Sequence, residues 1–234
     1  MSDYAWWIAN LMQPDADYNF EFAQEGLDTS AKVQNVAKKT QSGKSLEPDE
    51  YPTVLKLSQE GHSGERVLWP CNPENIPSIF KIWGLWFISR GLREAILKFN
   101  TFEGEFQQVR LLDREGYEIE KETWFINPRN LKKSFSPFKS DAVMMRLTGF
   151  GLRPDQIMSE NASFYAYNDD DILLHGSATT VADIWVEAFY LGTFFVSHSL
   201  YEYLVSRPEF SDIKFIRSPI VTSHSATSAC PWPQ

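Results

Sequence analysis

The strongest constraint in this sequence is a similarity of the chain to itself at an offset of 108 residues. Residues 84–97 have the sequence GLWFISRGLREAIL, and residues 192–205 have the sequence GTFFVSHSLYEYLV. In both segments an apolar run ends at a serine, Ser89 or Ser197, which suits the N-cap of a helix. The fold must therefore accommodate two similar units.

An amphipathic helical pattern follows each serine, with Leu92 and Leu200 at equivalent positions on the apolar face. Each pattern then leads into a strand, at 106–113 and at 213–217. We therefore predict an α+β fold with mixed or antiparallel sheets and two equivalent helices from an internal helix–strand repeat.

The length of 234 residues, 43% of them hydrophobic, fits one large domain or two small lobes. We predict an N-terminal region, 1–75, with strands and a mobile polar loop at about 24–50 that contains a short helix near 31–38. A second region, 76–217, carries the repeat units at about 76–113 and 184–217. Residues 218–234, rich in Ser, Thr and Pro, are expected to form a flexible tail.

A strand with alternating character, 117–127, is expected to pair with 106–113 through a turn at 114–116. Alternation places three carboxylates on one face of that strand. Glu115 lies in the turn, and a second acidic group occurs at 169–171. These surfaces are either solvated or bind a partner. The candidate binding residues are Glu115, Glu118, Glu120, Glu122, Asp169, Asp170 and Asp171.

Catalytic and metal-binding motifs are not found in the sequence. The four histidines form no HExxH motif, and neither Ser89 nor Ser197 lies in a G-x-S-x-G elbow. Asp169–Asp171 with His175 is an alternative cation site, but calcium loops need wider ligand spacing and a distal Glu. We therefore expect no catalytic residues, no metal and no cofactor.

The balance of charge favours a protein partner. The chain has 31 acidic and 22 basic residues, which gives a formal charge of -9. Nonspecific nucleic-acid binding needs a basic surface, whereas an acidic chain suits a basic protein. The start of the chain has no signal-peptide pattern, and no apolar run approaches the ~20 residues that cross a bilayer. We expect a cytoplasmic protein that contacts neither membrane nor nucleic acid.

Aromatic residues make up 15% of the chain, including eight tryptophans. Large aromatic side chains fill cores, but Trp and Tyr also dominate the binding hot spots of interfaces. The sequence does not separate these two roles.

Three short motifs resemble a known family. They are Phe87-Ile88-Ser89 with Leu92, Phe195-Val196-Ser197 with Leu200 and Phe215, and the aromatic segment Trp124-Phe125-Ile126-Asn127-Pro128 between them. Over about residues 76–217 the chain resembles family eleven of the polymorphic-toxin immunity proteins, formerly known only as a domain of unknown function. The acidic residue that often follows the aromatic segment is replaced here by a region with Ser134 and Ser136.

The resemblance implies a protein that binds and neutralises a cognate bacterial toxin, often delivered by a secretion system and encoded by a neighbouring gene. It would cover the toxin's active site or substrate channel. If the toxin were a nuclease, its basic channel would attract carboxylates. The alternatives are an enzyme of an unrecognised class with a carboxylate-lined pocket, and a structural or regulatory interaction module.

Overall fold

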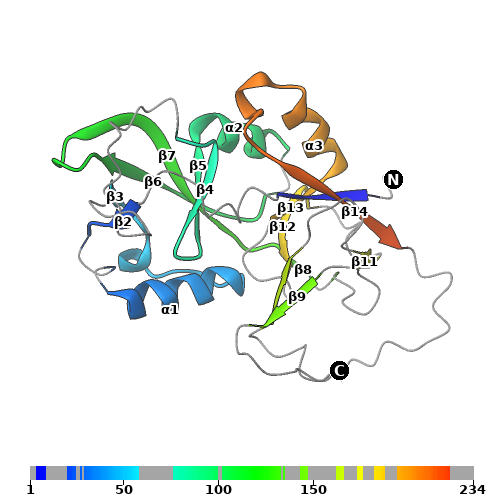
Figure 1. Cartoon of the computed structure of the whole chain (residues 1–234), viewed down its shortest axis with the longest axis horizontal. Helices are drawn as coiled ribbons and strands as arrows, with labels where there is room; N and C mark the ends of the chain where they lie inside the picture. Colours follow the sequence, from blue (N-terminus) through cyan, green and yellow to red (C-terminus); the bar gives the residue numbers. More distant parts are fainter. Residues whose placement is uncertain are drawn as a thin grey trace.

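The computed structural model shows an α+β fold (Figure 1). It describes residues 4–8, 20–24, 27, 29–57, 76–99, 102–132, 134, 143–146, 162–165, 173–175, 182–187 and 194–221. The helices of this part of the chain are α1 (Ser30–Gln41), α2 (Arg90–Lys98) and α3 (His198–Val205), with single 3-10 turns η2 (Pro48–Glu50) and η5 (Pro208–Phe210).

Two six-stranded sheets form most of the structure. Sheet one consists, in spatial order, of β2 (Phe20–Phe22), β3 (Val54–Leu57), β6 (Gly104–Leu112), β7 (Glu118–Pro128), β5 (Leu85–Ser89) and β4 (Ile79–Ile82). Sheet two consists of β11 (Leu174–His175), β14 (Phe215–Val221), β1 (Tyr4–Ile8), β13 (Phe194–Ser197), β12 (Ile184–Glu187) and β8 (Leu131–Lys132). A separate pair contains β9 (Val143–Arg146) and β10 (Ala162–Tyr165).

Five strands of each sheet share the same order and directions. In sheet one β3 is parallel to β6, and β6, β7, β5 and β4 then alternate in direction. In sheet two β11 is parallel to β14, and β14, β1, β13 and β12 alternate in the same way. The place of β7, which follows β6 along the chain, is taken in sheet two by β1 from the start of the chain.

The two predicted helices occur where the serine caps place them. The Ser89 hydroxyl accepts a hydrogen bond from the Leu92 backbone N–H at 3.3 Å, and Ser197 accepts one from that of Leu200 at 3.2 Å. Each cap satisfies one of the N–H groups that the first turn of a helix leaves without a partner. Leu92 and Leu200 are both buried, so these helix and burial predictions are confirmed.

One hydrophobic core joins both helices to both sheets. It includes Ile88 and Ile126 of sheet one, Ile184 and Val196 of sheet two, and the apolar faces of α2 and α3. The rings of Trp86 and Phe194 meet at its centre, with centroids 4.6 Å apart. Because residues from 8 to 213 contribute to this core, the two sheets are energetically dependent on each other.

Equivalent aromatic contacts hold each helix on its sheet. On α2, the Arg93 guanidinium lies over the Trp124 ring at 4.1 Å and faces Phe106 at 5.3 Å. On α3, the Tyr201 ring stacks on that of Trp6, with centroids 3.6 Å apart, and meets the Phe215 ring of β14 edge-on. In both sheets, therefore, a helix residue is held between rings of two adjacent strands.

Helix α1, at Ser30–Gln41, confirms the short helix expected near 31–38 and extends it, within the segment 24–50 that was otherwise expected to be a polar loop. The Thr29 hydroxyl caps its start, and Val33, Val36 and Ala37 are buried against the other face of sheet one. Val36 and Ala37 follow Val33 by three and four residues, so the three side chains lie on one side of the helix as a narrow apolar stripe.

The predicted boundary at residue 75 does not divide the structure. Strand β1 pairs with β13 and β14, and β3 pairs with β6, so the N-terminal region contributes strands to both sheets. The predicted tail is also shorter than expected, because β14 continues to Val221. Residues 222–234 lie outside the described ranges.

Because α2 and α3 share one core, shortening a buried leucine on either helix should reduce stability by a similar amount. Leu92→Ala and Leu200→Ala should each lower the free energy of unfolding by roughly 2–5 kcal/mol, because each leaves a cavity in a packed interior. Urea denaturation measures this loss. Leu97→Ala, on α2 but 41% exposed, is the matched control and should change stability little; equal losses at Leu92 and Leu97 would contradict the assigned packing.

Candidate functional site

The predicted acidic strand forms a hairpin with β6, as expected. In its turn the Asp113 carboxylate accepts hydrogen bonds from the backbone N–H groups of Gly116 at 2.8 Å and Tyr117 at 2.7 Å. Gly116 has a φ of 96°, which glycine adopts without a steric penalty. Glu115 lies exposed in this turn.

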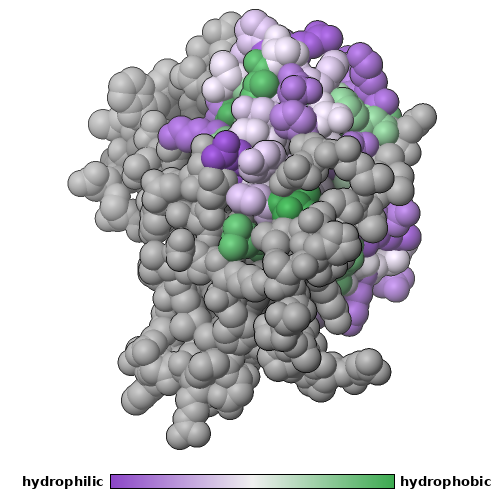
Figure 2. Space-filling model, turned by 90° about the vertical axis from the view of Figure 1, so that its right-hand side faces the viewer, coloured by the Kyte–Doolittle hydropathy of each residue, from purple (hydrophilic) through white to green (hydrophobic). Residues whose placement is uncertain are grey.

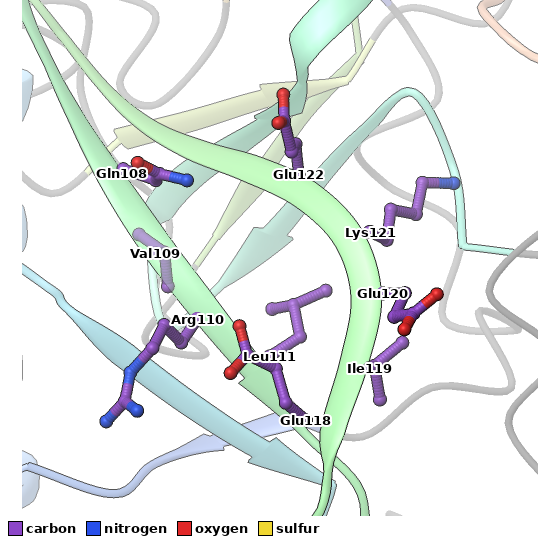
Figure 3. Close-up of a pocket in the computed structure, with 9 residues that line it drawn as sticks. All are labelled: Gln108, Val109, Arg110, Leu111, Glu118, Ile119, Glu120, Lys121 and Glu122. Atoms are coloured by element: carbon purple, nitrogen blue, oxygen red, sulfur yellow. The ribbon is translucent and has the colours of Figure 1, made fainter.

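A large bulge interrupts the hairpin beside the acidic residues. Val109 pairs with Thr123 and Leu111 pairs with Ile119, so a single residue of β6 lies opposite three residues of β7. Figure 3 shows β7 curving away from β6 between Glu122 and Glu118. Bulges of this kind bend a strand and often lie next to functional sites.

The bulge opens a pocket of about 240 Å³ between the two strands. Its apolar lining comes from Val109, Leu111 and Ile119, whereas its charged groups are Arg110, Lys121 and the three glutamates of β7. The Glu118 carboxylate turns toward β6 in Figure 3, and the Arg110 guanidinium points away from β7. The pocket thus combines apolar walls with carboxylates at its margin.

The predicted alternation along β7 is observed. Glu118, Glu120 and Glu122 are exposed, whereas Ile119 and Thr123 between and beside them are buried. Glu122 forms an ion pair of 3.2 Å with Arg90 of α2. Both of these side chains are exposed, and such surface pairs contribute little to stability. The arrangement can attract and hold a basic group.

The structure does not describe the second predicted acidic group. Asp169, Asp170 and Asp171 lie outside the described residues, as does the side chain of His175. Within the described ranges, no three His, Cys, Asp or Glu side chains are grouped to hold a metal ion. The same ranges contain no helix that is long and apolar enough to span a membrane.

The capping serines have structural partners. Besides capping α3, the Ser197 hydroxyl donates to the Asp183 carboxylate at 2.5 Å. The adjacent His198 faces elsewhere: its Nδ1 accepts from the Trp6 indole N–H at 3.2 Å, and its Nε2 lies 3.3 Å from Glu202. A serine nucleophile needs a base within hydrogen-bond reach, and His198 does not occupy that position.

A buried polar cluster in sheet two was not identified from the sequence. The fully buried Glu187 carboxylate accepts hydrogen bonds from the Ser134 backbone N–H at 2.8 Å and hydroxyl at 2.6 Å. The neighbouring Lys132 ammonium lies 3.8 Å from the centre of the Trp185 ring. Burial lowers the pKa of Lys132 to about 8, although Glu187 and Asp183 act in the opposite direction.

The structure separates the tryptophans into core and surface residues. Trp86 and Trp185 are each 1% exposed, whereas Trp83 is 57% exposed. No periodicity in the sequence distinguishes Trp83 from Trp86, because both lie in one apolar segment. The Trp83-Gly84 pair was the available signal, since glycine at such a position marks a hairpin turn.

Comparison with known proteins adds no family assignment, because no protein-family model and no curated protein matches the chain.

The capping role of the serines predicts that glycine can replace them. Ser89→Gly and Ser197→Gly should lower the free energy of unfolding by only a few tenths of a kcal/mol, whereas alanine should cost about 1 kcal/mol, because glycine is a tolerated N-cap. Thermal denaturation measures the difference. Glycine variants that are folded but have lost the protein's activity would show that the hydroxyls do more than cap helices.

The lowered pKa of Lys132 predicts unusual amine reactivity. Only a neutral amine reacts with acylating reagents, so labelling of Lys132 should reach half of its maximal rate near pH 8, rather than near the ordinary value of about 10.4. Mass spectrometry of tryptic peptides gives the profile. The chain unfolded in urea is the control, and an identical profile in both states would contradict the lowered pKa.

Proposed function

We propose that this chain is an immunity protein that binds and neutralises a cognate bacterial toxin. The observation that carries the proposal is the bulged acidic surface of β7, where Glu118, Glu120 and Glu122 surround the opening of a pocket with apolar walls. Such a surface suits a basic, partly apolar protein segment. Electrostatic attraction would speed the encounter, and the pocket would fix its position.

The resemblance to the immunity family supports the proposal through the structural roles of its motifs. Both Phe-(Ile or Val)-Ser motifs end a strand that leads directly into a helix. The aromatic motif Trp124–Pro128 is the part of β7 that pairs with β5 and β6. The similar residues are thus those that build the scaffold, and the acidic surface continues from the same strand.

We further propose that the two halves are copies of one unit, with β1 completing the second copy. Residue pairing supports this interpretation: Trp124 lies opposite Ile88 and Gln108, and Trp6 lies opposite Val196 and Arg217. The short sequences agree as well, with TWFI at 123–126 and AWWI at 5–8. In the second copy, the strand equivalent to β7 would therefore be β1, at the start of the chain.

Inhibition would follow from covering the toxin's active site or substrate channel with a patch of about 800 Å² on each partner. A nuclease toxin fits this surface best, because a channel that binds phosphates presents the basic groups that carboxylates attract. Figure 2 shows the side of the molecule on which α3 and β14 lie, where the coloured surface is mainly hydrophilic with hydrophobic residues in small separate groups. The toxin would be encoded by a neighbouring gene and met in the cytoplasm.

Neutralising the β7 surface should weaken the interaction chiefly through association. The variant Glu118→Gln, Glu120→Gln, Glu122→Gln should bind the neighbouring gene's product with an on-rate reduced about tenfold at low salt, because surface charges steer the encounter. The salt dependence of that rate should also decrease. Surface plasmon resonance at two salt concentrations measures both effects, and survival of cells that express the toxin measures protection.

The matched control removes the same number of charges elsewhere. Glu47→Gln, Asp49→Asn, Glu209→Gln changes exposed carboxylates outside β7, and its on-rate should stay within about twofold of wild type. If both triple variants behave alike, only net charge matters and the β7 site is refuted. If the wild-type chain neither binds the product nor protects cells, the proposed function is wrong.

A further inference from the structure

The hairpin between β4 and β5 carries the one non-glycine residue with positive φ among the described residues. Trp83 has a φ of 50° and Gly84 a φ of 89°, as in the type I′ turns that join two-residue hairpins. Asn, Asp or Gly normally occupies the first of these positions, because a large side chain there is strained. The tryptophan is therefore retained in a conformation that disfavours it.

The strained residue is also exposed. Trp83 is 57% exposed, although most tryptophans of the described part are buried or half-buried. Strain that persists on an exposed loop is a common sign of a functional contact, since packing gives no reason for it. Trp is also the residue most enriched in binding hot spots.

The helix on which the turn packs is rich in lysine. A Cβ added at Gly84 would lie 3.2 Å from Ala37 and Gln41, so the turn packs closely on the C-terminal half of α1, and Figure 1 shows the hairpin reaching that helix. Exposed Lys38 and Lys44 lie on either side of Gln41 in the chain, and the sequence from 29 to 46 contains no acidic residue. Leu131, 39% exposed, flanks the end of α1 beside Gly43.

We propose that Trp83, with Lys38, Lys44 and Leu131, forms a second binding surface, at which Trp83 inserts into an apolar pocket of the toxin that is edged by carboxylates. This inference rests on the proposed function, but not on the β7 surface, because Trp83 and Glu122 lie beyond opposite ends of β5. A protein is favoured over an anionic membrane or a nucleic acid because the chain's net charge of -9 would be repelled by both.

The decisive variant is Trp83→Asn, which creates an Asn-Gly turn. Asn-Gly is the preferred type I′ sequence, so the melting temperature should rise by about 2–4 °C. At the same time the Kd for the purified product of the neighbouring toxin gene should increase at least about tenfold. Isothermal titration calorimetry and thermal denaturation measure the two quantities. A gain in stability combined with a loss of binding separates an anchor from a structural residue.

Two controls accompany this variant. Val205→Asn changes an apolar side chain at the end of α3 that is 53% exposed. Because α3 contributes to neither proposed binding surface, this variant should leave the Kd unchanged. Lys38→Glu with Lys44→Glu should weaken binding, as expected for a carboxylate rim on the toxin.

Each contrary result overturns a definite part of the inference. If the wild-type chain binds and Trp83→Asn binds with the same affinity, Trp83 is not an anchor for the toxin. If Trp83→Asn has a lower melting temperature than wild type, the backbone at Trp83 is not strained. Binding of the wild-type chain to phosphatidylserine vesicles that is lost in Trp83→Asn would assign the surface to a membrane and refute a protein occupant. If wild type does not bind the toxin, the proposed function fails and the toxin is excluded as the occupant.

Discussion

Burial between the two sheets is the constraint on which the rest of this structure depends. Both α2 and α3 bury their apolar faces in a single core that contains Ile126 of sheet one and Val196 of sheet two. The Trp86–Phe194 contact lies between the sheets and links the two halves directly. Such a core makes the positions of all surface features depend on both sheets, including the acidic strand and the hairpin tip.

The β7 surface illustrates how a strand can serve the core and a partner together. One face of β7 contributes Ile119 and Phe125 to the core beneath α1, and the opposite face carries the glutamates. The bulge places Glu120 and Glu122 where β7 curves away from β6. Core packing and the proposed recognition therefore fall on alternate residues of one strand.

The two proposed binding surfaces carry opposite charges at opposite ends of β5. The carboxylates of β7 lie near the start of α2, whereas the lysines of α1 lie near the hairpin tip at the other end of β5. Two surfaces of opposite sign on one rigid sheet would orient a partner with a complementary dipole before contact. A chain with uniformly spread acidic residues would attract a basic partner without orienting it.

The sequence by itself determined the local units of this protein. The Ser89 and Ser197 caps, the buried Leu92 and Leu200, the β6–β7 hairpin and the alternation of its glutamates all follow from short-range rules, because capping, helical periodicity and strand alternation involve residues close in sequence. The tertiary structure alone decided how these units combine. Strand β1 enters sheet two across almost the whole chain, and the bulge appears only in the pairing register, because both depend on residues far apart in sequence. The Trp83-Gly84 pair signals a turn in the sequence, but the exposure of Trp83 and the packing of its turn on α1 depend on the tertiary structure.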